Sequence, residues 1–149
     1  MYYFDDVNKQ NELKKVLDEW IGTPFRHRVA VKNLGCDCIH FVGAVLHEMG
    51  ILDFSKVKIP DYAPDWHLHH TRQLLLEEIN KAIKVERVSL SKLRNGDIVL
   101  SHFGKAASHA SIYFGGQLYH ALNNIGVVNE EIHNSAVSKN LKYALRLLK

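Results

Sequence analysis

The sequence predicts an α+β fold, in which N-terminal helices pack on an antiparallel β-sheet. Up to about residue 83, apolar residues recur at the spacing of one helical face. After that point they alternate with polar residues as in strands, and turn signals at Arg94–Asp97 and Gly115-Gly116 separate the strand-like runs. Helices first and antiparallel strands after them is the order typical of this fold class.

Length and composition predict a single globular domain over residues 1–149. The net charge of +3 comes from scattered basic residues and is too weak to indicate a nucleic-acid partner. Two cysteines separated only by Asp37 cannot build a disulfide framework. No secretion signal is recognisable, and no apolar run approaches the roughly 20 residues of a membrane span. We therefore expect a soluble protein, cytoplasmic as synthesised, with release or phage-associated delivery as routes outward, and without a cofactor.

The first helix is predicted to begin after Asp5 or Asp6, which are both favourable N-caps. It should end at Gly22-Thr23-Pro24, because the residue before a proline is pushed out of the helical region. Residues 25–34 mix basic side chains with valines and are expected to form an exposed connector. The apolar face of the helix comprises Leu13, Val16, Leu17 and Trp20.

A second helix is predicted to begin at Cys38, with Asp37 as its N-cap and Gly50 just past its end. Cys38 then lies in the first turn, where unpaired N–H groups and the helix dipole favour an anion. Such a position can lower a thiol pKa from about 8.5 to roughly 3.5–7.5. The alternative is a small buried hydrophobe, the commoner role of an isolated cysteine. The apolar face comprises Cys38, Phe41, Val42, Val45, Leu46 and Met49.

Residues 53–66 are expected to be irregular because two prolines interrupt them, and residues 67–83 are expected to form an amphipathic helix. This helix would open with His67, His69 and His70. A metal site is conceivable there, but a solvated, histidine-rich helix start is the commoner arrangement. The remaining strands are expected to form a meander at Ile98–Leu100, Ser108–Phe114, Gln117–Leu122, Ile125–Ile132 and Lys142–Leu148.

The Gly115-Gly116 hairpin brings two histidines together. With a two-residue turn, Phe114 faces Gln117, so His109 and His120 lie on one face as diagonal neighbours, with Cβ atoms about 7 Å apart. A register error of one residue would put them on opposite faces. Ala110, Ile112 and Phe114 occupy the other face and are expected to be core.

A thiol on a helix N-terminus, a histidine and a second polar ring that orients it form the nucleophile, base and orienting group of a cysteine hydrolase. One alternative is a pair of surface histidines with no chemical role. Another is a zinc site formed by Cys36, Cys38 and nearby histidines, although Cys-x-Cys without a second pair is a weak zinc signal.

Five short runs, taken in order, resemble motifs of the NlpC/P60 peptidases, which are papain-like cysteine hydrolases that cleave peptidoglycan stem peptides. The resemblance extends from about residue 17 to residue 121. It implies a papain-like fold, with Cys38 as nucleophile, His109 as general base and His120 as the orienting third residue. The substrate would be a peptide or peptidoglycan, attacked through an acyl-enzyme. The matching runs are Gly22–Arg26, Asp37–Val42, Asn95–Asp97, His109–Gly115 and Tyr119–Ala121.

The chain departs from the family pattern beside the nucleophile. Phe25 replaces a tyrosine, and Ile39-His40 replaces Ser-Gly, whose serine helps to hold the amine of the stem peptide in family members. We assign Phe25, Asp37 and Ile39 to substrate binding and expect a broadened or shifted specificity. The same three catalytic groups could instead serve an acyltransferase, or an amidase or thioesterase acting on a substrate outside the wall.

Overall fold

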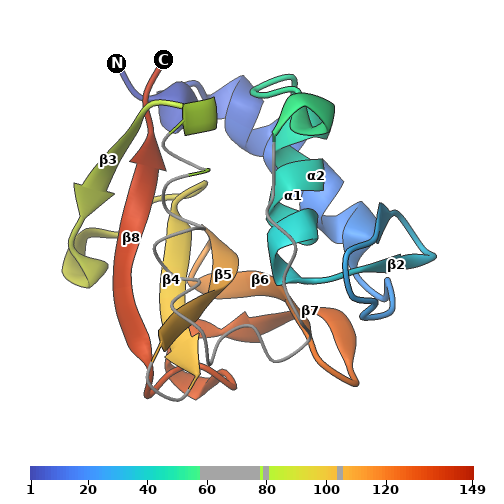
Figure 1. The fold of residues 1–149 in the computed structure, drawn as a ribbon. Coiled ribbons are helices and arrows are strands. Elements are labelled where there is room, and N and C mark those ends of the chain that lie inside the picture. The colour runs from blue at the N-terminus through green and yellow to red at the C-terminus, as the bar shows by residue number, and fades with distance from the viewer. Residues whose placement is uncertain (58–77, 79–80, 104–105) are drawn as a thin grey trace.

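The computed structural model describes residues 1–57, 78, 81–103 and 106–149. In this part of the chain, α1 (Val7–Trp20) and α2 (Cys38–Glu48) pack together on one side of a six-stranded antiparallel sheet (Figure 1). The predicted α+β class is therefore confirmed. The two chain ends lie side by side, and Tyr2 pairs with Leu148.

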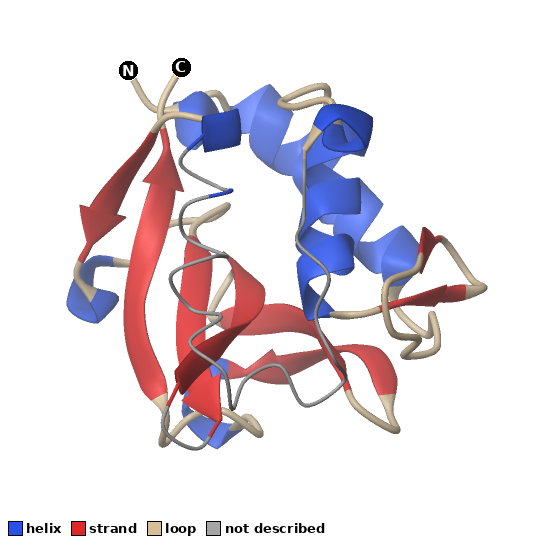
Figure 2. Ribbon diagram, viewed as in Figure 1, coloured by secondary structure: helices blue, strands red, loops and turns tan. Residues whose placement is uncertain are grey.

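The large sheet has the strand order β3-β8-β4-β5-β6-β7, and a separate ribbon pairs β1 with β2. Figure 2 shows the sheet twisting, so that β6 and β7 run across the ends of β4 and β8. Short 3-10 turns lie at Tyr3–Asp5, Phe54–Lys56, Leu90–Lys92 and Ile132–Asn134. The strands are β1 (Ala30–Val31), β2 (Gly35–Cys36), β3 (Val85–Val88), β4 (Ile98–Phe103), β5 (Ala106–Phe114), β6 (Gln117–Leu122), β7 (Gly126–Glu131) and β8 (Leu141–Leu147).

The predicted meander is correct for β4 to β7 and wrong for the last strand. β8 does not extend the sheet beyond β7 but lies between β3 and β4, where Leu145 pairs with Ile98. In that position Leu145 and Leu147 join the core under the helices. At the edge of the sheet beyond β7, they would not reach this core. Strand alternation reveals which face a residue occupies but not which strand is its neighbour.

The predicted first helix is confirmed. Asp6 is the N-cap and accepts a hydrogen bond from the Asn8 backbone N–H at 2.8 Å. The helix ends at Trp20, and Gly22 follows with a φ of +91°, a conformation that glycine adopts without strain. The expected connector over residues 25–34 is instead partly ordered, since it includes β1 and the half-buried Phe25 bridges Cys36.

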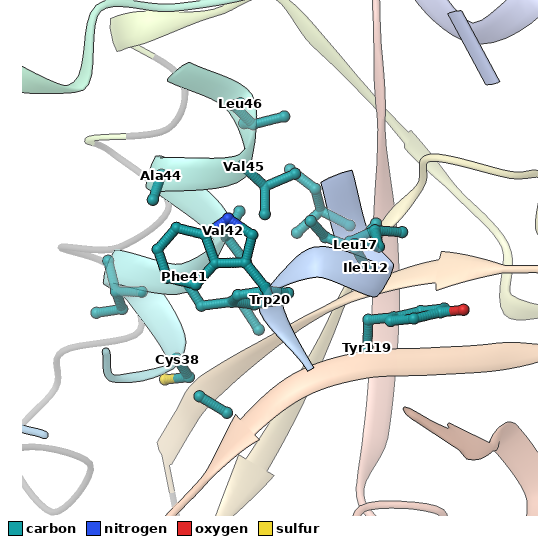
Figure 3. Close-up of a cluster of buried hydrophobic side chains, with 14 of the residues drawn as sticks. Leu17, Trp20, Cys38, Phe41, Val42, Ala44, Val45, Leu46, Ile112 and Tyr119 are labelled. Atoms are coloured by element: carbon teal, nitrogen blue, oxygen red, sulfur yellow. The ribbon is translucent and has the colours of Figure 1, made fainter. Parts of the chain in front are cut away.

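The second predicted helix is likewise confirmed, with Asp37 as the N-cap of α2 and Gly50 at a φ of +72° just past its end. Its apolar face packs on α1 and on the sheet (Figure 3). Trp20 of α1 meets Phe41 of α2 edge to face, with ring centroids 5.9 Å apart. Burial of each such side chain contributes about 1.5–3 kcal/mol to the folded state, so this cluster holds α2 against the strands.

The Arg94–Asp97 turn is anchored by a buried ion pair. Asp97 accepts hydrogen bonds from Arg146 of β8, from Nε at 2.9 Å and from Nη2 at 2.8 Å. Gly96 has a φ of +94° and lies against the Phe4 ring, where a Cβ would come within 2.2 Å of that ring. The Asn95–Asp97 motif therefore ties the start of β4 to the end of the chain.

The expected irregular segment and the helix over 67–83 lie largely outside the described residues, as do His67, His69 and His70. Glu78, Lys81 and Ala82 are helical, which agrees with the expectation at those positions. Among the described residues, no helix is long and apolar enough to cross a membrane.

Candidate active site

The loop after α1 fixes the position of the segment that leads into Cys38 relative to the sheet. On one side, the Gly22 N–H donates to the Val127 carbonyl at 2.9 Å, and the Val127 N–H donates to the Thr23 carbonyl at 2.8 Å. On the other side, the Cys36 N–H donates to the Pro24 carbonyl at 3.0 Å. The Gly22–Arg26 motif thus links β7 directly to β2, which leads into Asp37 and Cys38.

Gly126 of β7 lies where this loop approaches the sheet most closely. It has a φ of +101°, and a Cβ there would lie 2.5 Å from the Thr23 carbonyl oxygen. A side chain at residue 126 would force the loop away from β7. Because residue 126 is a glycine without a side chain, the backbone of the loop can pair with β7.

Cys38 is the first residue of α2, at the end of the helix that meets the strands (Figure 3). Its side chain is 6% exposed. α2 packs on β5, and the backbone of Ala110, the residue directly after His109, lowers the pKa of the thiol. The helix that carries the thiol and the strand that carries the histidine therefore meet at this point.

The expected lowering of the Cys38 pKa is wrong for this site. Burial, and next the negative charge of Asp37, raise the pKa of the Cys38 thiol to about 12. Backbone hydrogen bonds at Ala110, Ile39 and Cys38 itself lower the pKa but do not reverse this effect. A helix N-terminus favours a thiolate, but a desolvated position beside a carboxylate opposes it more strongly. The Cys38 thiol is therefore neutral at pH 7.

The hairpin register is as predicted, with Phe114 opposite Gln117 and Ile112 opposite Tyr119. His109 and His120 are adjacent, as expected, and Nε2 of His109 lies 2.8 Å from Nδ1 of His120. Both rings are buried, with 3% and 0% exposure. The alternative of two surface histidines is therefore wrong, and both faces of the hairpin are buried, not only the face of Ala110 and Ile112.

Burial sets the protonation of this pair. It lowers the pKa of His109 well below the ordinary value of 6.5, and the neighbouring His120 lowers it further. Burial also lowers the pKa of His120, although a hydrogen bond and the charge of Glu130 act in the opposite direction. Both imidazoles are therefore neutral at pH 7 and able to accept a proton.

A β-bulge directly precedes His109. Ser101 of β4 pairs with His109 whereas His102 pairs with Ala107, which leaves Ser108 as the extra residue. A bulge bends the strand and re-aims the neighbouring side chain. Ser101, opposite His109, has a buried hydroxyl for which the described structure offers no hydrogen-bond partner.

Two residues that the sequence analysis did not single out contact His120. Ser111 Oγ lies 3.0 Å from Nδ1 of His120, and Glu130 Oε1 lies 2.8 Å from its Nε2. Glu130 is on β7, where Val128 pairs with His120, so the carboxylate reaches His120 diagonally across the two strands. Side chains on β7 alternate between the two faces of the sheet. Together with a predicted register for the β6–β7 turn, this alternation would have placed Glu130 on the same face as His120.

Of the residues assigned to substrate binding, Asp37 and Ile39 adjoin Cys38 in the chain, and Phe25 pairs with Cys36. Ile39 is buried in the core, and Phe25 packs against the same cluster. Asp37 accepts hydrogen bonds from the His40 N–H at 2.9 Å and, through its other oxygen, from the Arg28 N–H at 2.8 Å. The His40 ring also lies 2.8 Å from Asp37 through Nδ1. Their roles in binding stay predictions.

The zinc alternative finds no ligand set among the described residues, where no three His, Cys, Asp or Glu side chains are grouped as a metal would need. Cys36 is fully buried in the core, and burial raises the pKa of its thiol to about 12.

Known proteins resemble this chain in sequence and in structure. The NlpC/P60 family profile matches residues 22–146. The chain is 26% identical to the murein DD-endopeptidase MepS/murein LD-carboxypeptidase of Escherichia coli K12, over 97% of this chain and 69% of that protein. Among solved structures, a lipoprotein-like NLP/P60 protein of Staphylococcus aureus aligns with a TM-score of 0.66 at 18% identity, over 97% of this chain and 43% of that one.

The NlpC/p60 domain of the peptidoglycan hydrolase SagA aligns with a TM-score of 0.59 at 17% identity, over 91% of this chain and 97% of that domain. The chain is thus comparable in extent to a single domain of this kind and spans less than half of the staphylococcal protein. The family profile covers well over half of the chain, and the solved structures share its α+β architecture. The chain belongs to the NlpC/P60 family and has its papain-like fold.

Proposed function

We propose that this protein is a cysteine hydrolase that cleaves amide bonds of peptidoglycan stem peptides, or of a related peptide, through an acyl-enzyme. One observation carries the proposal. α2, which begins at Cys38, packs on β5, where the backbone of Ala110 influences the Cys38 thiol and the preceding residue, His109, is hydrogen-bonded to His120 through Nε2. Nucleophile, base and orienting group are thereby supplied by α2, β5 and β6, all held by the buried core.

The neutral state of both groups determines the first step. Because the pKa of the thiol is raised and that of His109 is lowered, proton transfer accompanies attack instead of preceding it. Nδ1 of His109 takes the thiol proton while the Cys38 sulfur forms a bond to the carbonyl carbon of the substrate. Backbone N–H groups in the first turn of α2 would stabilise the negative charge that develops on the carbonyl oxygen.

The tetrahedral intermediate then collapses. The C–N bond breaks, the leaving amine takes the proton from His109, and the acyl group remains on sulfur as a thioester. In the second half of the reaction, His109 removes a proton from water, which attacks the thioester carbon. The C–S bond then breaks, the carboxylic acid product leaves, and the sulfur of Cys38 regains its proton from His109.

The substrate class rests on the relatives. A murein endopeptidase and a peptidoglycan hydrolase are among the proteins that this chain resembles. The site differs from the family pattern at Phe25 and Ile39, neither of which offers a hydrogen bond from its side chain. The proposed substrate is therefore a stem peptide or similar chain that this site recognises without a serine beside the nucleophile.

The experiment is digestion of purified peptidoglycan and of soluble stem peptides, with the products identified by liquid chromatography and mass spectrometry. The proposal expects new amine and carboxylate ends with the wild-type protein and none with Cys38→Ala. Cys36→Ala is the matched control and should still cut. No cleavage of any stem peptide, together with Cys38-dependent hydrolysis of a protein amide or a lipid thioester, would overturn the proposed substrate class in favour of the amidase or thioesterase alternative.

A further inference from the structure

Glu130 makes the outermost contact of the histidine pair. Its Oε1 lies 2.8 Å from Nε2 of His120, whose ring is completely buried, while the Glu130 side chain itself is 27% exposed. The same oxygen accepts a hydrogen bond from the Ala136 N–H at 3.3 Å, which fixes the carboxylate from the other side. An ionised carboxylate can only accept hydrogen bonds, so Nε2 of His120 must carry a proton.

This proton determines the state of the other nitrogen of His120. Burial lowers the pKa of His120, so the ring is neutral, and with a proton on Nε2 its Nδ1 must be an acceptor. Two groups point at Nδ1, the Ser111 hydroxyl at 3.0 Å and Nε2 of His109 at 2.8 Å. Both must donate. His109 therefore carries its proton on Nε2 and leaves Nδ1 unprotonated.

We propose that Glu130 is a positioning residue that sets the tautomers of His120 and, through it, of His109. This inference deepens the proposed function and rests on it for its consequence, because unprotonated Nδ1 is the atom that removes the Cys38 proton. Without a carboxylate at residue 130, His120 is free to protonate Nδ1. Nε2 of His109 would then accept a hydrogen bond from Nδ1 of His120, and the proton of the His109 ring would lie on its Nδ1. A protonated Nδ1 cannot act as a base.

Ring-nitrogen chemical shifts from two-bond ¹H–¹⁵N correlation spectra test the proposal without reference to activity. In the wild-type protein at pH 7 we expect pyrrole-like shifts for Nε2 of both rings and pyridine-like shifts for Nδ1. Glu130→Leu should give a mixed tautomer at both histidines. Glu131→Gln is the matched control, because its exposed side chain is on the neighbouring residue of β7, and it should leave the spectra unchanged. A proton on Nδ1 of His109 in the wild type, or an unchanged spectrum in Glu130→Leu, would overturn the proposal.

Kinetics separate this proposal from the proposed function. For Glu130→Leu we expect kcat on a stem peptide to fall by about 10–100-fold, by analogy with the loss of groups that orient metal-binding histidines, with little change in KM. Glu130→Gln retains an acceptor oxygen and should recover most of kcat. The fall of its kcat at acidic pH should lie at lower pH than in the wild type, because the charge that raises the pKa of His120 is gone. An equal fall in both variants would argue for a merely structural role. Wild-type tautomers as expected, with no Cys38-dependent cleavage, would refute the proposed function alone.

Discussion

Nε2 of His109 lies 2.8 Å from Nδ1 of His120, with the two rings edge to face at 64°. The contact commits Nε2 of His109 to its neighbour, so in the proposed mechanism Nδ1 is the nitrogen that exchanges a proton with Cys38. It also gives the two histidines unequal tasks, since one would exchange protons with the nucleophile and the other would orient the first.

Substitution of the two histidines should therefore have unequal effects. His109→Ala should reduce kcat as far as Cys38→Ala does, because groups that act as a unit give strongly non-additive losses. His120→Asn or His120→Gln should retain part of kcat, since either amide oxygen can accept from the Nε2–H of His109. Steady-state kinetics on a stem peptide measure this, with circular dichroism to confirm folding. Complete loss in folded variants at both positions would contradict the orienting role of His120.

The pH profile should reflect the lowered pKa of His109. A base accepts a proton only when neutral, and burial next to His120 keeps His109 neutral to well below pH 6.5. The value of kcat/KM should therefore stay level from about pH 8 through 6.5 and fall only at lower pH. The raised pKa of Cys38, about 12, leaves no thiol ionisation in this range. A half-maximal value at or above pH 6.5 would show that the active base is not the buried His109.

The protein should show little preference for substrates with a free N-terminal amine over substrates whose amine is blocked. Ile39 and Phe25 lack the hydroxyls of the family pattern, and both Asp37 oxygens already accept hydrogen bonds from backbone N–H groups. An unmade hydrogen bond in a buried site typically costs about 1–3 kcal/mol, so a site without the partner should discriminate little. The measurement compares kcat/KM for one stem peptide in its free and N-acetylated forms. A preference of a hundredfold or more for the free amine, roughly 2.7 kcal/mol, would show that another residue supplies the recognition.

The Asp97–Arg146 pair should matter for stability. Both groups are buried, and Arg146 also donates to the Lys92 carbonyl at 2.7 Å. Arg146→Met leaves the Asp97 carboxylate buried without its cation, which should lower the free energy of unfolding by about 3–5 kcal/mol. Lys14→Met is the control, because the Lys14–Asp18 pair is exposed and should be worth about 1 kcal/mol or less. Urea unfolding of both variants measures the difference, and equal effects would contradict a structural role for the pair.

Local signals carried most of what could be predicted from the sequence. Asp37 and Gly50 mark the ends of α2 because capping depends on a few neighbouring residues, and Gly115-Gly116 fixes the His109–His120 register for the same reason. The position of β8 between β3 and β4, the contact of Glu130 with His120 and the raised pKa of Cys38 depend on segments far apart in the chain. Helix position alone favours a thiolate at Cys38, and burial of the thiol in the folded protein, together with the charge of Asp37, reverses that expectation.

The most direct test of the account is to trap the acyl-enzyme. Wild-type protein, Cys36→Ala and Cys38→Ala are mixed with excess stem peptide, quenched in acid within the first turnover and digested for peptide mapping by mass spectrometry. The account predicts a thioester adduct on Cys38 in the wild type and in Cys36→Ala, and neither adduct nor cleavage in Cys38→Ala. Cleavage that persists in Cys38→Ala, or an acyl group found on Cys36 or another residue, would contradict the assignment of Cys38 as the nucleophile.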